Sequence, residues 1–291
     1  LFPDRSTMIN TNDIGLLHPW SMPWLLLTAR YYRRPVDLGL WYEFQGPDHP
    51  RRPYGYQLPW VERTCPAAVP WAQENWHIPT HALTFLWWEA DEPFISLQAA
   101  ALPTADYTPG TEAVNARTSW SRDAVYLNIP GGGRSHASHG HAHADCGHFS
   151  LFAHGEYLAV DTGRYNVDED QHNVMLVDGR CFLPSQGWSH NRRSGRLANF
   201  QRHGLLEYVR ADAAAIKNCI WADRHLLFIR MGGDDAYLVT LDNINVDNQH
   251  HSYWWQLQTN PTHSLAITGA STAGLTAPQA RLDLHFIPPT K

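Results

Sequence analysis

Histidines gather in one short stretch of the chain, where they alternate with small residues. Seven of the 18 histidines lie between positions 136 and 172, and the centre of this stretch reads His139-Gly-His141-Ala-His143-Ala-Asp145. Because side chains alternate between the two faces of an extended chain, the three imidazoles and the carboxylate would share one face. Imidazole and carboxylate are the usual ligands of zinc-like ions and also carry protons in catalysis. The stretch therefore predicts a metal or catalytic site.

The residues that follow predict a β-hairpin over positions 149–161. A three-residue loop, 153–155, with its glycine in the left-handed conformation, would place Asp161 on the same face as His143 and Asp145. A two-residue loop would place Asp161 on the opposite face. We therefore expect the three-residue loop, because it gathers the candidate ligands.

A further strand is expected at positions 174–177, directly after His172. His143, Asp161 and His172 are then expected to meet at one end of three neighbouring strands. Three protein ligands would leave a position open for water, as in a catalytic zinc site, whereas four would make a structural site. Asp145 is either the fourth ligand or a neighbour that orients a histidine.

Two other classes of metalloenzyme use a His-x-His motif. Metallo-β-lactamase-like hydrolases continue it as His-x-His-x-Asp-His, but this chain has Cys146 at the last position. Amidohydrolase barrels follow it with repeated strands and helices, and no such alternation appears after residue 146. Both classes fit the sequence less well, although a zinc metallohydrolase stays as a third functional alternative.

Three spaced motifs resemble the C-terminal domain of the heparinase II/III-like polysaccharide lyases. They are His141-Ala-His143-Ala-Asp145, Leu158-Ala-Val-Asp161-Thr-Gly after Gly155, and His172-Asn173 leading into Leu-Val-Asp-Gly. The resemblance implies that His141 is a catalytic-site residue. It also implies that His143, Asp161 and His172 bind a zinc ion, which would be structural.

The reaction implied by the resemblance is β-elimination in a uronate-containing polysaccharide such as alginate or a glycosaminoglycan. The enzyme must neutralise the substrate carboxylate, remove the weakly acidic C5 proton and protonate the departing O4. The guanidinium group of arginine pairs with carboxylate or sulfate. Tyr165 follows Arg164 directly and carries a phenol. We expect Arg164, Tyr165, Arg192 and Arg193 to bind this anionic substrate.

Pattern changes along the chain predict two parts. Helical spacing and caps occur before about residue 105, and short alternating segments without helices follow from about residue 112. We expect residues 1–108 to form a helical segment, the end of an α/α toroid, and residues 109–291 to form a large antiparallel β-sandwich. The resemblance also implies a catalytic tyrosine and an asparagine or histidine in the part of the family's sequence before this region, so we expect a polysaccharide lyase, either complete or truncated. The alternative is a zinc-stabilised carbohydrate-binding β-domain without activity.

Composition excludes several functional classes. The 291 residues carry a formal net charge of −6 with a pI near 6.3, which argues against a nucleic-acid binder. No apolar run approaches the roughly 20 residues that cross a bilayer, and no signal peptide is visible. The family resemblance implies a periplasmic or secreted location. The four cysteines show no CxxC spacing, and we expect Cys146 to be a buried free thiol.

Overall fold

The computed structural model of the protein describes residues 103–108, 113–119, 121, 123–131, 145–162, 168–179 and 195–287. Within these residues the chain forms antiparallel sheets, as predicted, with short helical turns between them. The helices expected before residue 103 lie outside the described residues. The β region begins earlier than position 109, because Ala105–Thr108 is already a strand of the first sheet.

The first sheet has five strands that follow one another in chain order. Their pairing is antiparallel throughout. Strands β2 and β3 are buried along their whole length, so both faces of the sheet are covered there. The strands are β1 (Ala105–Thr108), β2 (Ala113–Arg117), β3 (Tyr126–Pro130), β4 (Ser150–Ala153) and β5 (Glu156–Ala159).

The second sheet has four longer strands in the order β10-β9-β8-β7. Burial alternates residue by residue along β8 and β9, as expected of strands that cover a core with one face only. A short helix, α5 (Ala214–Lys217), connects these two strands. The strands are β7 (Arg196–His203), β8 (Leu206–Asp212), β9 (Trp221–Arg230) and β10 (Ala236–Asn245).

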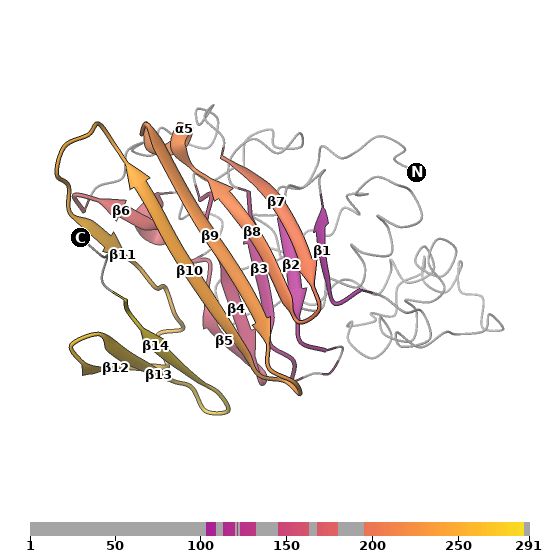
Figure 1. Ribbon diagram of the computed structural model, residues 1–291. Helices are drawn as coiled ribbons and strands as arrows, with labels where there is room; N and C mark the ends of the chain where they lie inside the picture. Colours follow the sequence, from indigo (N-terminus) through magenta and orange to yellow (C-terminus); the bar gives the residue numbers. More distant parts are fainter. Residues whose placement is uncertain are drawn as a thin grey trace, which may run out of the picture.

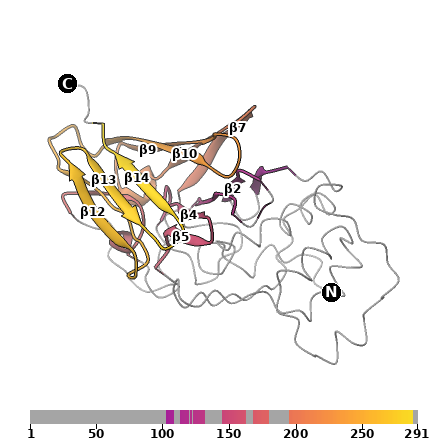
Figure 2. The ribbon, with the colours of Figure 1, turned by 90° about the horizontal axis from the view of Figure 1, so that it is seen from below.

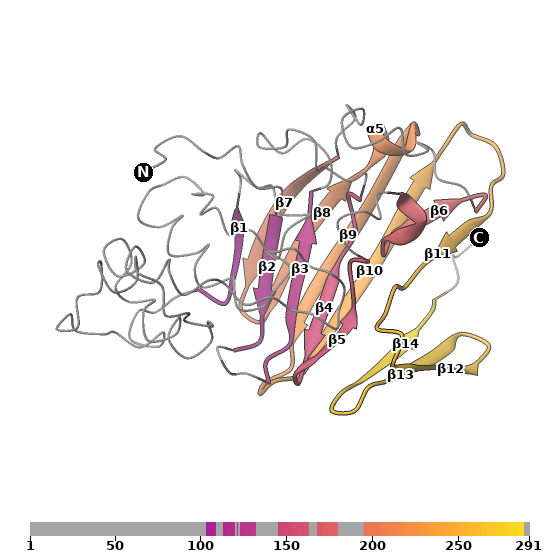
Figure 3. The ribbon, with the colours of Figure 1, turned by 180° about the vertical axis from the view of Figure 1, so that it is seen from behind.

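The two sheets lie face to face and enclose one hydrophobic core (Figures 1 and 3). Leu127 and Leu151 of the first sheet belong to the same buried cluster as Val209, Leu226 and Phe228 of the second. Burying a side chain of this size stabilises the fold by about 1.5–3 kcal/mol. The described part of the chain is therefore a β-sandwich, with its core between the sheets.

Two smaller sheets complete the described structure. Strand β6 (Met175–Val177) pairs with β11 (Tyr253–Trp255), and β12, β13 and β14 form a three-stranded sheet beside the sandwich (Figure 2). The prediction that the strand after His172 lies next to the hairpin is therefore wrong, since its partner comes from much later in the chain. The last three strands are β12 (Ser264–Gly269), β13 (Thr272–Thr276) and β14 (Arg281–His285). None of the helices in the described ranges is long and apolar enough to cross a membrane.

The hairpin of β4 and β5 confirms the predicted strands but not the predicted loop. Ala153 pairs with Glu156, so the loop contains only His154 and Gly155, with φ angles of 49° and 87°. The register then shifts at a bulge, after which Leu151 pairs with Ala159. One extra residue, whether in a bulge or in the loop, moves the following side chains of the strand to the opposite face of the sheet. The residues after the bulge therefore point to the same faces of the sheet as they would after the expected three-residue loop.

Candidate metal centre

Asp145, Asp161 and His172 meet in the interior of the protein. Asp145 precedes β4, Asp161 follows β5, and His172 is the C-cap of the 3-10 turn η3 (Glu169–Gln171). One potential ligand atom from each residue lies within 4.8 Å of the other two. The residues are only 0%, 3% and 0% exposed, respectively. Side chains from three separate segments therefore converge on one buried point.

Hydrogen bonding fixes which nitrogen of His172 faces the carboxylates. Its Nδ1 lies 2.8 Å from the backbone carbonyl oxygen of Asp168. A carbonyl can only accept, so Nδ1 carries a proton, and in a neutral ring Nε2 then keeps its lone pair. Nε2 lies 3.5 Å from Oδ2 of Asp161 and 4.0 Å from Oδ2 of Asp145. Such a histidine, held through its other nitrogen, is a typical metal ligand.

The neighbouring His148 has the opposite tautomer. The backbone N–H of Asn173 donates to Nδ1 of His148 at 2.9 Å, so a proton on this neutral ring must be on Nε2. Nε2 lies 3.2 Å from Oγ of Ser150 and 3.9 Å from Oδ2 of Asp161. His148 therefore has no lone pair to offer a metal, although its ring is fully buried beside His172.

The donor set fits a divalent cation. Ligand atoms in a tetrahedral zinc site are about 3.3 Å apart, because each lies about 2.0–2.2 Å from the metal. The measured separations of 3.5 and 4.0 Å are close to this value. Two carboxylates buried so near each other also favour a cation between them, since like charges in the interior destabilise each other's ionised forms. Asp145, Asp161 and His172 could hold such an ion.

Asn173 ties the surrounding segments together. Its side-chain amide donates to the carbonyl oxygens of Phe149 and Val160 at 2.8 and 3.1 Å. Its side-chain oxygen accepts the backbone N–H of Gln258. Asn173 is fully buried, and it thereby joins the segments on both sides of the hairpin to the residues after β11. The residue next to His172 is thus a structural crosslink.

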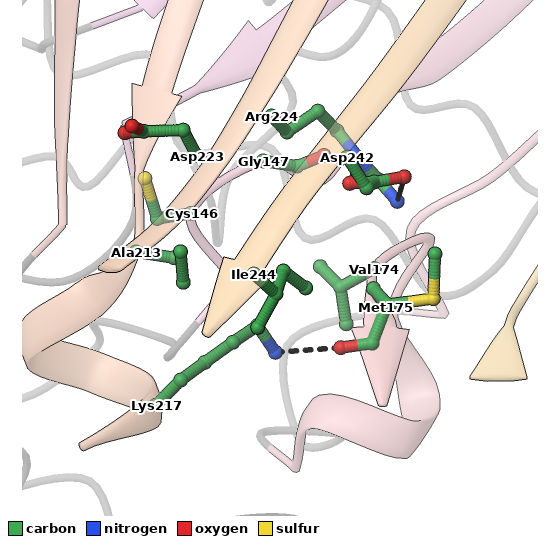
Figure 4. A pocket seen from close by; sticks show the side chains of 11 residues that line it. Cys146, Gly147, Val174, Met175, Ala213, Lys217, Asp223, Arg224, Asp242 and Ile244 are labelled. Atoms are coloured by element: carbon green, nitrogen blue, oxygen red, sulfur yellow. Dashed lines mark hydrogen bonds and ion pairs between the residues drawn. The ribbon is translucent and has the colours of Figure 1, made fainter. Parts of the chain in front are cut away.

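Arg224 of β9 connects the second sheet to the same segments. Its guanidinium makes a bidentate ion pair with Asp242, at 2.7 and 3.0 Å, and Nη1 donates to the carbonyls of Gly147 and Asn173 at 2.9 and 2.6 Å. Figure 4 shows Arg224 and Asp242 beside a small internal cavity. The cavity, with a volume of about 10 Å³, has room for about one water molecule and none for a sugar.

A buried ion pair fixes the turn that leads to His172. Nζ of Lys217, from α5, lies 2.7 Å from Oε1 of Glu169 and donates to the carbonyl of Met175 at 2.7 Å (Figure 4 shows the second bond). Asp168, whose backbone carbonyl accepts the hydrogen bond from Nδ1–H of His172, caps the same turn in a capping box with Gln171. The position of His172 therefore depends on contacts made by α5.

The structure brings Asp161 and His172 together and adds Asp145, which the sequence left as either a ligand or a neighbour. The sequence reasoning did not identify His148, Asn173, Lys217 or Arg224. His148 could have been noticed as one more histidine of the cluster, whereas the others give no local signal. The remaining predicted site residues lie outside the described residues, and their roles stay predictions; they are His141, His143, Arg164, Tyr165, Arg192 and Arg193. Cys146 is a buried thiol, as expected.

Comparison with protein-family models gives no match, and comparison with curated protein sequences gives none either. Solved structures do match. The heparan sulfate lyase HepC from Pedobacter heparinus is 14% identical over 77% of this chain and 32% of its own, with a TM-score of 0.51. A HepC mutant gives 13% identity over 76% and 33%, with a TM-score of 0.48. Heparinase III gives 14% identity over 61% and 28%, with a TM-score of 0.46.

This chain spans about a third of the length of HepC. At 14% identity the similarity concerns the fold alone. The predicted resemblance to a heparinase-type lyase is thereby confirmed for the fold: the chain has a fold similar to that of part of the heparan sulfate lyase HepC.

Proposed function

We propose that this chain is the β-sandwich part of a polysaccharide lyase that cleaves a uronate-containing polysaccharide by β-elimination. The observation that carries the proposal is the buried convergence of Asp161 and His172, from two of the three lyase-like motifs. Asp145, from the remaining motif, lies at the same point. Their setting is a sandwich with a HepC-like fold. Alginate and glycosaminoglycans are the substrate classes that the motifs suggest.

The proposed chemistry needs a proton carrier and an anion-binding surface. His141 would transfer a proton or contact the substrate carboxylate, because imidazole titrates near neutral pH. Arg164, Arg192 and Arg193 would bind carboxylate or sulfate groups, and Tyr165 would add a phenol to the cleft. These assignments rest on the motifs and on the residue types.

Asp161 and His172 would hold a zinc ion together with His143, and Asp145 is placed to join them. When bound, zinc would act as a crosslink between the ends of the hairpin and the turn before β6. The burial of the three described residues supports a structural ion, since elimination requires no metal-bound nucleophile. We further propose that residues before the sandwich form the end of a helical toroid and that the protein is periplasmic or secreted. The resemblance to the heparinase II/III-like lyases implies both.

Binding without cleavage is the second candidate. The buried metal centre supports it, because a structural ion stabilises a domain whether or not that domain is catalytic. The chain would then be a zinc-stabilised carbohydrate-binding domain.

Incubation of the purified chain with alginate, heparan sulfate and hyaluronan separates the two candidates. β-Elimination creates unsaturated sugar ends, so ultraviolet absorbance should rise with one of these polymers. The H141A variant should lose this activity while still binding the polymer. Binding of a polymer by the wild-type chain without any rise in absorbance would favour the second candidate instead.

A further inference from the structure

We propose that His148 is a positioning residue that orients the Asp161 carboxylate for the cation of the candidate metal centre. The inference rests on the metal site of the proposed function. It extends that site to a residue that supplies no ligand atom.

The His148 ring is held in one orientation. The N–H of Asn173 donates to Nδ1 at 2.9 Å, and the backbone position of that N–H is set by the other hydrogen bonds of Asn173. The ring is fully buried and makes an edge-to-face contact with His172, with ring centroids 5.4 Å apart and an interplanar angle of 88°. A rotation of the ring would break both the hydrogen bond from Asn173 and the ring contact with His172.

The fixed ring places Nε2 beside both Ser150 and Asp161. Nε2 must carry the proton of the neutral ring, and it lies 3.9 Å from Oδ2 of Asp161, with Oγ of Ser150 at 3.2 Å. Oγ of Ser150 is within hydrogen-bond distance of Nε2 and Oδ2 of Asp161 is not, so the N–H acts on the carboxylate only through its dipole, in a buried and weakly screened setting. The same Oδ2 faces Nε2 of His172 at 3.5 Å. His148 thus acts on the oxygen that is best placed to bind the cation.

Two substitutions separate this role from a purely structural one. Asparagine can reproduce the acceptor at Nδ1 but has no group at the Nε2 position. Glutamine can place an N–H near the Nε2 position but offers no acceptor at Nδ1. H148N should therefore keep the bond to Asn173 and lose the interaction with Asp161, and H148Q should do the reverse.

The experiment measures zinc affinity of the full chain, stripped of metal, by competition with a chromophoric chelator, alongside the thermal midpoint of the metal-free protein. H148N should bind zinc 10- to 100-fold more weakly than wild type, as is typical when a partner of a metal ligand is removed. Its midpoint should fall as well, because the ring contact with His172 is lost. H148Q should lower the midpoint yet bind zinc within about threefold of wild type, because it keeps the donor that orients the ligand. H263N is the control, since the side chain of His263 is buried and faces Glu156 at the far end of β5. The zinc affinity of H263N should match wild type.

Equal zinc affinity in H148N and wild type would overturn the proposal, and so would a loss in H148Q as large as that in H148N. If H148N does not fold, H148Q decides: retained affinity supports the proposal and a tenfold loss overturns it. Absence of zinc binding by the wild-type chain is a different result. It would remove the metal centre of the proposed function, and the role of His148 with it.

Discussion

Arg224 links the candidate metal centre to the second sheet through a single side chain. It is 4% exposed and combines a bidentate pair to Asp242 with donation to the carbonyls of Gly147 and Asn173. These two carbonyls belong to the segments that carry Asp145 and His172. A planar guanidinium can serve all these acceptors at once, which an ammonium group cannot.

Replacement of Arg224 by lysine should therefore destabilise the protein although the charge is kept. At least two buried hydrogen bonds would be lost, at about 1 kcal/mol or more each, so we expect a loss of about 2–3 kcal/mol in the free energy of unfolding. Denaturant titration measures it. The control is R210K on the adjacent strand, where a partly exposed pair with Asp223 at 3.5 Å should contribute less than about 1 kcal/mol. Equal losses in the two variants would contradict the crosslinking role of Arg224.

The hairpin of β4 and β5 positions Asp161 through its turn. His154 and Gly155 both have positive φ, the pattern of a two-residue turn whose twist matches that of the strands. A β-carbon at Gly155 would meet only the end of the Gln279 side chain, at 3.4 Å. The conformation, more than crowding, therefore requires glycine here.

The G155A variant should lose about 1–2 kcal/mol of unfolding free energy, because a left-handed backbone is costly for an L-residue with a β-carbon. Thermal or chemical denaturation would show this loss. Gly274 of β13 provides the comparison: an added β-carbon there would be at least 3.5 Å from its neighbours, and G274A should change stability by less than about 0.5 kcal/mol. A G155A protein as stable as wild type would mean that the turn has another conformation.

A second link between elements joins the end of β6 to the segment before β11. Nδ1 of His251 lies 2.7 Å from Oδ2 of Asp178, and Nε2 lies 2.9 Å from Oδ1 of Asp247. The hydrogen bonds to Asp178 and Asp247 raise the pKa of His251 above its ordinary value of 6.5. Hydrogen bonds from His251 and from Ser252 lower the pKa of Asp178 from 3.8 to about 2. His251 is therefore held between two carboxylates that favour its protonated form.

This arrangement predicts a stability difference that depends on pH. The raised pKa of His251 contributes stability that is fully present below pH 6.5 and is lost as the pH rises through the folded-state value. The lowered pKa of Asp178 contributes stability that is present above about pH 3.8 and is lost as the pH falls toward 2. The thermal midpoint of H251Q should therefore fall furthest below that of wild type between these limits. The matched control is H250Q, at the exposed His250, and the difference between its thermal midpoint and that of wild type should vary little with pH. A difference for H251Q that is constant with pH would refute the interaction.

For the whole molecule, alternation in the sequence was enough to predict a sandwich. The strands around Leu226 and Val209 alternate cleanly, and the β4–β5 hairpin was placed within a residue or two. The loop length was missed because a bulge near Leu151 and a longer loop change the strand register in the same way. The sequence pattern does not distinguish the two.

Long-range pairing is the other part that periodicity does not encode. Strand β6 pairs with β11, whose Trp254 lies opposite Leu176 although 78 positions separate them. Asn173 and Arg224 look like ordinary polar residues in the sequence, since their partners come from distant segments. The metal-ligand types were visible in advance, but the tautomers of His148 and His172 depend on backbone groups that only the fold brings near.

The convergence of Asp145, Asp161 and His172 on one cation is tested most directly by anomalous diffraction at the zinc absorption edge, from crystals of the full chain grown with zinc. We expect one strong peak about 2.0–2.2 Å from Nε2 of His172 and from a carboxylate oxygen of Asp161. A map with no peak between these residues, or with its peak beside His148, would contradict a shared cation at this point.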